Sequence, residues 1–261
     1  MKMRSIYSLA LFSAAGTLLV TSTSLRASET DDRIESSAKK SYVFKTYLKD
    51  DSIKTESKNG VVTLTGTVAE SSHRTLAENT VESLPGVTSV DNQLKVKGEI
   101  HAEHSDGWLS VKVKTALLFH RNVSASGTSV YVKDGVVSLR GEASSQAQKE
   151  LTTEYARDVE GVKEVKNQMM IAKTPAKPAE TIGEKIDDAS ITAQVKASLT
   201  SHRSTSALKT KVETTDGVVT VSGVAKNAAE KSLVTKLVTD IYGVSSVVNN
   251  MTITLAAASN K

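Results

Sequence analysis

The sequence contains no cysteine, only three prolines and few aromatic residues, which make up 4% of its 261 positions. Without cysteine the chain forms no disulfide, has no thiol nucleophile and offers no cysteine for the lipid anchor of a lipoprotein. Hydrophobic residues make up 39% of the chain, which suffices for several small cores and argues against a disordered chain. We therefore expect folded modules that are each only modestly stable alone.

A large charge excess is also lacking. The formal net charge is +4, but Lys2, Arg4 and Arg26 fall in a segment that we expect to be removed. The remaining 30 basic and 29 acidic residues leave a net charge of about +1. Little counterion release would then drive binding to a phosphate backbone, so we expect no nucleic-acid partner.

Residues 1–27 are typical of a secretory signal peptide. Lys2 and Arg4 precede the apolar run Ile6–Val20, and Ala27 offers a small residue for cleavage, although Leu25 fits poorly two positions before it. The run is short for a transmembrane anchor, which needs roughly 20 residues and is the alternative. The mature chain is thus predicted to be exported and to begin near Ser28.

The remainder of the chain repeats one pattern three times. Each copy contains a segment of the same length that begins with Asn-Gly or Asp-Gly and ends with Gly. These hairpin segments are Asn59–Gly66, Asp134–Gly141 and Asp216–Gly223. A second glycine and then an asparagine follow at identical intervals in every copy, at Gly86 and Asn92, Gly161 and Asn167, and Gly243 and Asn249. Chance would not hold these offsets through three copies, so we infer three tandem modules.

The pattern predicts a hairpin in each module. Asn-Gly or Asp-Gly between two alternating runs indicates a type I′ turn, because both central residues need positive φ. The predicted strand pairs are Ser52–Lys58 with Val61–Thr65, Ser129–Lys133 with Val136–Arg140, and Leu208–Thr214 with Val218–Ser222. A helix follows, opened by capping-box pairs such as Ser145 with Gln148 and Asn227 with Glu230, and ended by the second glycine. The final strands are Val87–Val96, Val162–Ile171 and Val244–Ile253.

An earlier helix precedes each hairpin. Apolar residues recur at four-residue spacing at Leu109, Val113 and Leu117 in copy two, and at Ile191, Val195 and Leu199 in copy three. In copy one we match Phe44 and Leu48 to this helix. That match gives copy one a shorter loop, because Leu48 lies closer along the chain to Gly60 than Leu117 lies to Gly135. It also places Asp51 where the other copies have His120 and His202.

The sequence therefore predicts an α+β fold of three tandem α-β-β-α-β modules, each a three-stranded sheet packed by two helices on one face. The predicted domains are residues 31–96, 105–172 and 186–253. Lys173–Lys185 holds two of the three prolines and is expected to be a semi-extended linker.

The glycine and asparagine pattern resembles the BON domain family, the modules of bacterial hyperosmotically inducible periplasmic proteins. The resemblance rests on the hairpin segment, the second glycine at its fixed interval and the following asparagine, and it covers nearly the whole mature chain. It implies the α-β-β-α-β fold, a location in the periplasm, and binding of phospholipid or envelope proteins. It implies no enzymatic activity.

The residues themselves indicate no catalytic site, metal or cofactor. The repeated glycines have neither the spacing nor the Lys-Ser/Thr of a phosphate loop, and no serine lies in a Gly-x-Ser-x-Gly elbow. His101 and His104 lie one helical turn apart in a connector but lack further ligands. His120-Arg121 and His202-Arg203 occupy equivalent positions, where cations complement the end of a helix. Asp31-Asp32 and Asp187-Asp188 are interpreted as acids at helix starts.

One surface exceeds what the fold requires. In copy two, Leu109, Val113, Ala116 and Leu117 suffice for the core stripe, yet further apolar and cationic residues lie on the other faces, where copy three is mostly polar. We predict that this set contacts lipid or a partner protein: Trp108, Val111, Lys112, Leu118, Phe119 and Arg121. Packing against a neighbouring module is the equal alternative.

The sequence thus favours a non-enzymatic periplasmic protein whose modules bind phospholipid surfaces or envelope proteins, in osmotic or envelope stress. A holdase-type chaperone that uses exposed apolar patches is the second candidate, and a structural adaptor is the third.

Overall fold

The computed structural model describes residues 22–97, 105–123, 125, 127–172, 186–205 and 210–254. Most of the expected signal peptide (1–21), the linker 173–185 and both connector histidines, His101 and His104, lie outside the described residues. Within them the three predicted modules are confirmed.

The modules share one order of elements, to which module 1 adds a second short helix. Module 1 comprises α1 (Ser22–Lys40), α2 (Tyr42–Thr46), β1 (Ser52–Lys58), β2 (Val61–Val68), α3 (Ser71–Glu82), β3 (Ser89–Asn92) and β4 (Lys95–Val96). Module 2 comprises α4 (Asp106–Leu118), β5 (Thr128–Lys133), β6 (Val136–Ala143), α5 (Gln146–Arg157), β7 (Glu164–Asn167) and β8 (Met170–Ile171). Module 3 comprises α6 (Asp188–Ser201), β9 (Thr210–Thr215), β10 (Val218–Ala225), α7 (Ala228–Thr239), β11 (Ser246–Asn249) and β12 (Thr252–Ile253).

The second strand is central in every sheet. β2 pairs antiparallel with β1 and parallel with both β3 and β4, and β6 and β10 are paired in the same way. The predicted third strand is therefore split into two short segments. The repeated asparagine sits at this break. Asn167 Oδ1 accepts a hydrogen bond from the Met169 amide at 2.9 Å, and its Nδ2 donates to the Lys149 carbonyl of α5 at 2.9 Å.

The three hairpin turns have the predicted geometry. Asn59 and Gly60 have φ values of +53° and +78°, and the Asp-Gly pairs of the other modules are within a few degrees of these. The glycine that ends the hairpin segment meets a different demand. A Cβ on Gly141, at φ +128°, would lie 1.9 Å from the carbonyl oxygen of Gly127, so only glycine fits there.

The first helix of module 1 corrects one sequence prediction. Ile34 and Ala38 of α1, which are 1% and 0% exposed, occupy the positions of Leu109 and Val113 in module 2. Phe44 and Leu48 belong to α2 and the turn after it, an addition specific to module 1. The inferred shorter loop and the equivalence of Asp51 with His120 were therefore wrong. The polar sequence of α1 hid its register, because the small Ala38 carries little hydrophobic signal.

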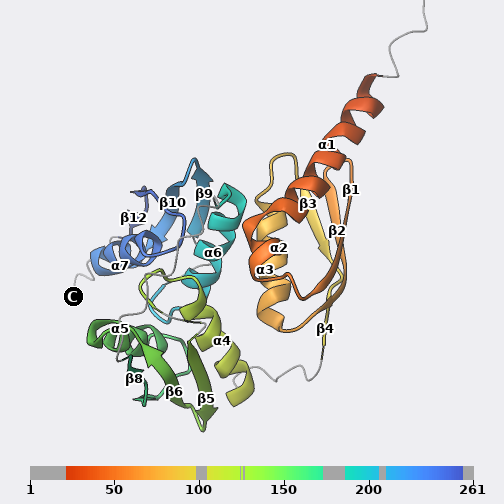
Figure 1. The fold of residues 1–261 in the computed structure, drawn as a ribbon. Coiled ribbons are helices and arrows are strands. Elements are labelled where there is room, and N and C mark those ends of the chain that lie inside the picture. Colours follow the sequence, from red (N-terminus) through yellow and green to blue (C-terminus); the bar gives the residue numbers. More distant parts are fainter. Residues whose placement is uncertain are drawn as a thin grey trace, which may run out of the picture.

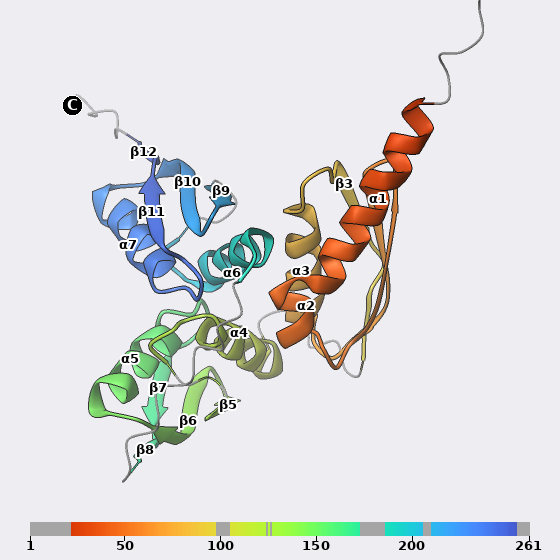
Figure 2. The same ribbon diagram turned by 45° about the horizontal axis from the view of Figure 1, so that its top comes forward.

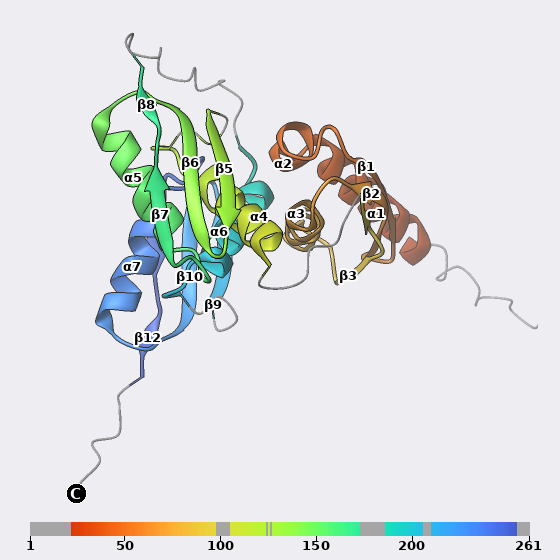
Figure 3. The ribbon, with the colours of Figure 1, turned by 90° about the horizontal axis from the view of Figure 1, so that it is seen from below.

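The three modules meet around α6. This helix contacts both α3 of module 1 and α4 of module 2, and it lies at the centre of the molecule in Figures 1 and 2. Figure 3 shows α3, α4 and α6 next to one another. Nearly every residue of α6 is buried, including polar ones such as Gln194 and Ser198. The cores of modules 1 and 3 form one continuous cluster, whereas most of the core of module 2 is separate.

Candidate functional site

A carboxylate from the first helix clamps each hairpin turn. Asp31, Asp106 and Asp188 each accept two main-chain hydrogen bonds of 2.7–2.9 Å from the Asn-Gly or Asp-Gly pair of their own module. The amide of Gly60 lowers the pKa of Asp31, and that of Gly135 lowers the pKa of Asp106. The sequence interpretation missed this role. The constant spacing from this Asp to the turn Gly (31 to 60, 106 to 135, 188 to 217) could have revealed it.

The two His-Arg pairs form a nearly symmetric interface between modules 2 and 3. Arg121 Nη2 donates to the carbonyls of Ile241 and Val244 at 2.6 and 3.0 Å. Arg203 Nη2 donates to the equivalent carbonyls of module 2, Val159 and Val162, at 3.3 Å each. The histidines take part in equivalent isolated antiparallel β-bridges, in which His120 pairs with Ile241 and His202 pairs with Val159. Arg121 and Arg203 therefore bind carbonyls of the segment that follows the last helix of the neighbouring module.

Both histidines of this interface are buried beside carboxylates. His120 Nδ1 lies 3.2 Å from Asp240 Oδ2, its Nε2 lies 3.2 Å from Ser198 Oγ, and its ring stacks on Tyr155 with centroids 3.9 Å apart. Burial lowers the pKa of His202, against the opposing effect of Asp158. The arrangement gives these side chains structural partners at the interface. Among the described residues, no group of three or more His, Asp or Glu side chains is arranged to hold a metal ion.

The structure separates the six predicted contact residues into two groups. Phe119 is 1% exposed and packs edge-to-face on Tyr47 of module 1, with ring centroids 5.4 Å apart. Leu118 is half-buried against the same cluster, and Arg121 is engaged with module 3. In this structure these three residues contact neighbouring modules. A lipid could reach Phe119 only if the modules separated.

The other three residues lie toward the first turns of α4. Trp108 and Val111 are half-buried, and Trp108 packs against the core of its own module. The Lys112 ammonium lies 4.4 Å from the centroid of the Trp108 ring and 3.4 Å from Glu160. Lys114, on the same helix, is exposed. Trp108 and Lys112 combine an amphipathic ring with a cation and form the half-buried part of the predicted site. Lys114 lines a different cavity, together with Glu70 and His73 of module 1.

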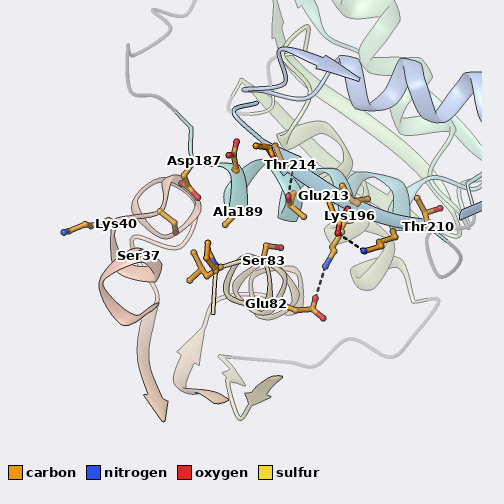
Figure 4. A pocket seen from close by; sticks show the side chains of 18 residues that line it. Ser37, Lys40, Glu82, Ser83, Asp187, Ala189, Lys196, Thr210, Glu213 and Thr214 are labelled. Carbon is orange, nitrogen blue, oxygen red and sulfur yellow. Dashed lines mark hydrogen bonds and ion pairs between the residues drawn. The ribbon is translucent and has the colours of Figure 1, made fainter. Parts of the chain in front are cut away.

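A second candidate site, which the sequence did not indicate, is a cleft of about 1190 Å³ between modules 1 and 3. One wall comes from the ends of α1 and α3, with Ser37, Lys40 and Glu82–Pro85. The other wall comes from the start of α6 and from all of β9. Figure 4 shows Lys196 reaching across to Glu82, and their ion pair measures 2.8 Å. No local sequence signal predicts the cleft, because its walls come from modules that are far apart along the chain.

The comparisons with known proteins agree with this architecture. The BON domain matches residues 30–98, 105–173 and 187–254, so this chain belongs to the BON domain family. It is 35% identical over 146 residues to Osmotically-inducible protein Y of Escherichia coli (strain K12), covering 56% of this chain and 71% of that protein. It is 31% identical over 109 residues to Outer membrane lipoprotein DolP of Haemophilus influenzae, covering 41% of this chain and 56% of that protein.

A solved structure is also similar. The C-terminal domain of CdsD, the structural protein of the type III secretion system of Chlamydia trachomatis, matches 82% of this chain and 96% of that domain at 17% identity, with a TM-score of 0.23. This likeness carries no functional argument. In the part of the chain that the structure describes, none of the helices is both long and apolar enough to cross a bilayer.

Proposed function

We propose that this chain is a non-enzymatic periplasmic envelope protein that binds anionic phospholipid surfaces through the accessible part of α4. The observation that carries the proposal is the contact between the Lys112 ammonium and the Trp108 ring, whose centroid lies 4.4 Å away, on the half-buried face of α4. Indole rings favour the boundary between water and lipid, and nearby ammonium groups favour anionic headgroups.

The expected strength follows from the residues involved. Each Lys close to an anionic membrane surface contributes about 1 kcal/mol, and burying a large apolar side chain contributes roughly 1.5–3 kcal/mol. Trp108 is half-buried already, so its contribution belongs at the lower end. Contributions of this size predict reversible membrane binding. The binding should weaken as salt is added, because interactions between exposed charges are screened beyond about 10 Å at 0.1 M salt.

Flotation of the mature chain with vesicles tests the proposal. Vesicles of phosphatidylglycerol mixed with phosphatidylcholine should carry the protein upward, and pure phosphatidylcholine vesicles should carry much less. Trp108 is the only tryptophan, so its emission should shift to the blue on binding. Trp108→Ser should weaken binding about tenfold.

Tyr131→Ser is the matched control, since Tyr131 is an aromatic residue of the same module that is 58% exposed on β5. This variant should bind vesicles like the parent chain. Equal flotation of the parent chain and Trp108→Ser, or an unchanged emission spectrum, would remove α4 as the contact.

Export is the second element of the proposal. The relatives' names associate this family with osmotic induction and with the outer membrane, and the segment Met1–Ala27 is typical of a signal peptide. Mass spectrometry of the periplasmic fraction should find a chain that begins near Ser28. A periplasmic chain that retains Met1–Ala27 would contradict this.

The holdase alternative has less support. The described large apolar side chains that are well exposed are spread over the three sheets, with Val61 on the first, Tyr131, Met170 and Ile171 on the second, and Val224, Val248 and Ile253 on the third. They do not gather into one client-sized patch. Suppression of aggregation of a denatured enzyme would be the assay that favours it over lipid binding.

A further inference from the structure

The first strand of each module lies at the edge of its sheet, since among the described strands β1, β5 and β9 each pair with the central strand alone. An edge strand presents N–H and C=O groups that can bind another strand, and proteins commonly cover them. In β9, Thr215 pairs with Val218 directly across the two-residue turn. Residues next to a type I′ turn exchange hydrogen bonds with each other. The main-chain groups of Val212 and Thr214 therefore point toward the free edge.

Modules 1 and 2 cover this edge with a side chain from the same position of the first helix. In module 1, Glu35 Oε1 accepts a hydrogen bond of 2.9 Å from the amide of Ser57, the residue equivalent to Thr214. In module 2, the Ser110 hydroxyl donates at 3.4 Å to the carbonyl of Val130, the residue equivalent to Val212. Both contacts confirm that the main-chain groups at these positions point toward the free edge of the sheet, as the register indicates.

Module 3 lacks such a cover. Thr192 stands at the position of Glu35 and Ser110, but its hydroxyl bonds the side chain of Thr214 at 2.7 Å instead of a main-chain group. Within the described part of the chain, no other segment hydrogen-bonds the main chain of Val212 or Thr214. Among the three described edge strands, β9 is therefore the one whose main-chain groups accept or donate no hydrogen bond with a side chain of the first helix.

The uncovered edge faces the cleft between modules 1 and 3. The whole of β9 lines it, opposite Glu82–Pro85 (Figure 4). An added strand of about six residues is about 20 Å long and occupies about 4.8 Å in the sheet and about 10 Å across it, which is on the order of 950 Å³. The cleft of about 1190 Å³ has room for it.

We propose that the free edge of β9 binds an extended polypeptide segment of a partner protein, which adds a strand to the sheet of module 3. Main-chain hydrogen bonds to Val212 and Thr214 supply the affinity, as in other cases of strand addition. The walls of the cleft carry hydroxyl groups and charged groups of both signs, such as Lys40, Lys211 and Glu213. The segment's alternate side chains are accordingly polar or of mixed charge. This site is independent of the lipid contact on α4.

The test transplants the cap of module 1 into module 3. Thr192→Glu with Thr214→Ser recreates the Glu35–Ser57 pair, which should close the edge. The probe is fluorescently labelled, reduced and carboxymethylated α-lactalbumin, a permanently unfolded polypeptide, added to the mature full-length chain. We expect the transplant to weaken binding roughly tenfold or more. Amide exchange across β9 should slow when the probe binds to the parent chain.

Two further variants keep the test decisive. Thr214→Pro removes an edge amide without removing a bond to β10, which edge strands tolerate, and it should also weaken binding. Val132→Pro is the matched control at the equivalent edge position of module 2 and should bind like the parent chain. Circular dichroism and thermal melting verify that each variant folds.

The results discriminate clearly. Loss of binding in both module 3 variants, with protection of β9, supports the proposal. Unchanged binding in the transplant overturns it, as does protection confined to another segment. Absence of probe binding, combined with a parent chain that self-associates and a transplant that does not, would also overturn it and assign the edge to a second copy of this chain.

Discussion

Replacing Phe119 by alanine should loosen the junction of the three modules. The side chain is 1% exposed and contacts Tyr47 of module 1. The carbonyl of Phe119 also accepts a hydrogen bond of 3.1 Å from the amide of Tyr242 in module 3. Because main-chain bonds hold the backbone at this point, the surroundings cannot collapse fully into the vacated space. A buried Phe→Ala change then costs roughly 3–5 kcal/mol.

The loss is measurable by thermal unfolding. At roughly 2–4 °C per kcal/mol for a chain of this size class, it corresponds to a fall in Tm of roughly 6–20 °C. Trp108→Ala is the control, since that side chain is half-buried and lies away from the junction, and its effect should be less than half as large. Small-angle scattering should show that Phe119→Ala expands the chain.

A double-mutant cycle with Tyr47→Leu sharpens the test. An edge-to-face aromatic pair should show a coupling energy of about 0.5–1.5 kcal/mol. If Phe119→Ala unfolds no earlier than Trp108→Ala and shows no coupling to Tyr47, Phe119 does not hold the modules together and the interpretation of the junction fails.

Three other outcomes are expected. Gly135→Val should destabilise module 2 by about 1–2 kcal/mol, because a β-branched residue resists its φ of +79°; an unchanged urea midpoint would contradict this. Hydrogen bonds from the turn amides hold the pKa of Asp31 and Asp106 below the ordinary value of about 3.9 in the folded chain. The stability they provide is therefore present above that value and is lost as the pH falls through the folded pKa, so Asp31→Asn with Asp106→Asn should flatten the acid limb of a stability–pH curve. Limited proteolysis should cut first within Lys173–Lys185, where the sequence predicts a proline-containing linker between modules, and a first cut inside Val218–Ser222 would count against the three-module division.

The local geometry of the modules was predictable because its signals are short-range. An Asp-Gly pair demands positive φ wherever it stands between alternating runs, as Asp134 and Gly135 show. Ser145 caps its helix in the predicted way, with its Oγ accepting from the Gln148 amide at 3.1 Å. Neither feature needs information from another module.

The prediction of the first helix of module 1 was wrong for the opposite reason. Its buried face relies on Ile34 and the small Ala38, whereas Phe44 and Leu48 give a stronger apolar pattern nearby. The apolar periodicity therefore pointed to Phe44 and Leu48. The true register is marked by the interval from Asp31 to Gly60, which is the same in all three modules. A polar contact between Asp31 and Gly60 set the alignment that hydrophobicity could not.

By itself the sequence determined the number of modules, the order of helices and strands along the chain and the turns, because each depends on backbone preferences and on burial within one repeat. Only the tertiary structure decided how the modules associate. Phe119 could face lipid or a neighbour until Tyr47 was placed against it, and equivalent residues such as Glu35 and Thr192 differ in whether they cover an edge strand. Residues that are solvent-exposed in an isolated module carry no local signal of their partner, and that choice is made by contacts between segments distant in the chain.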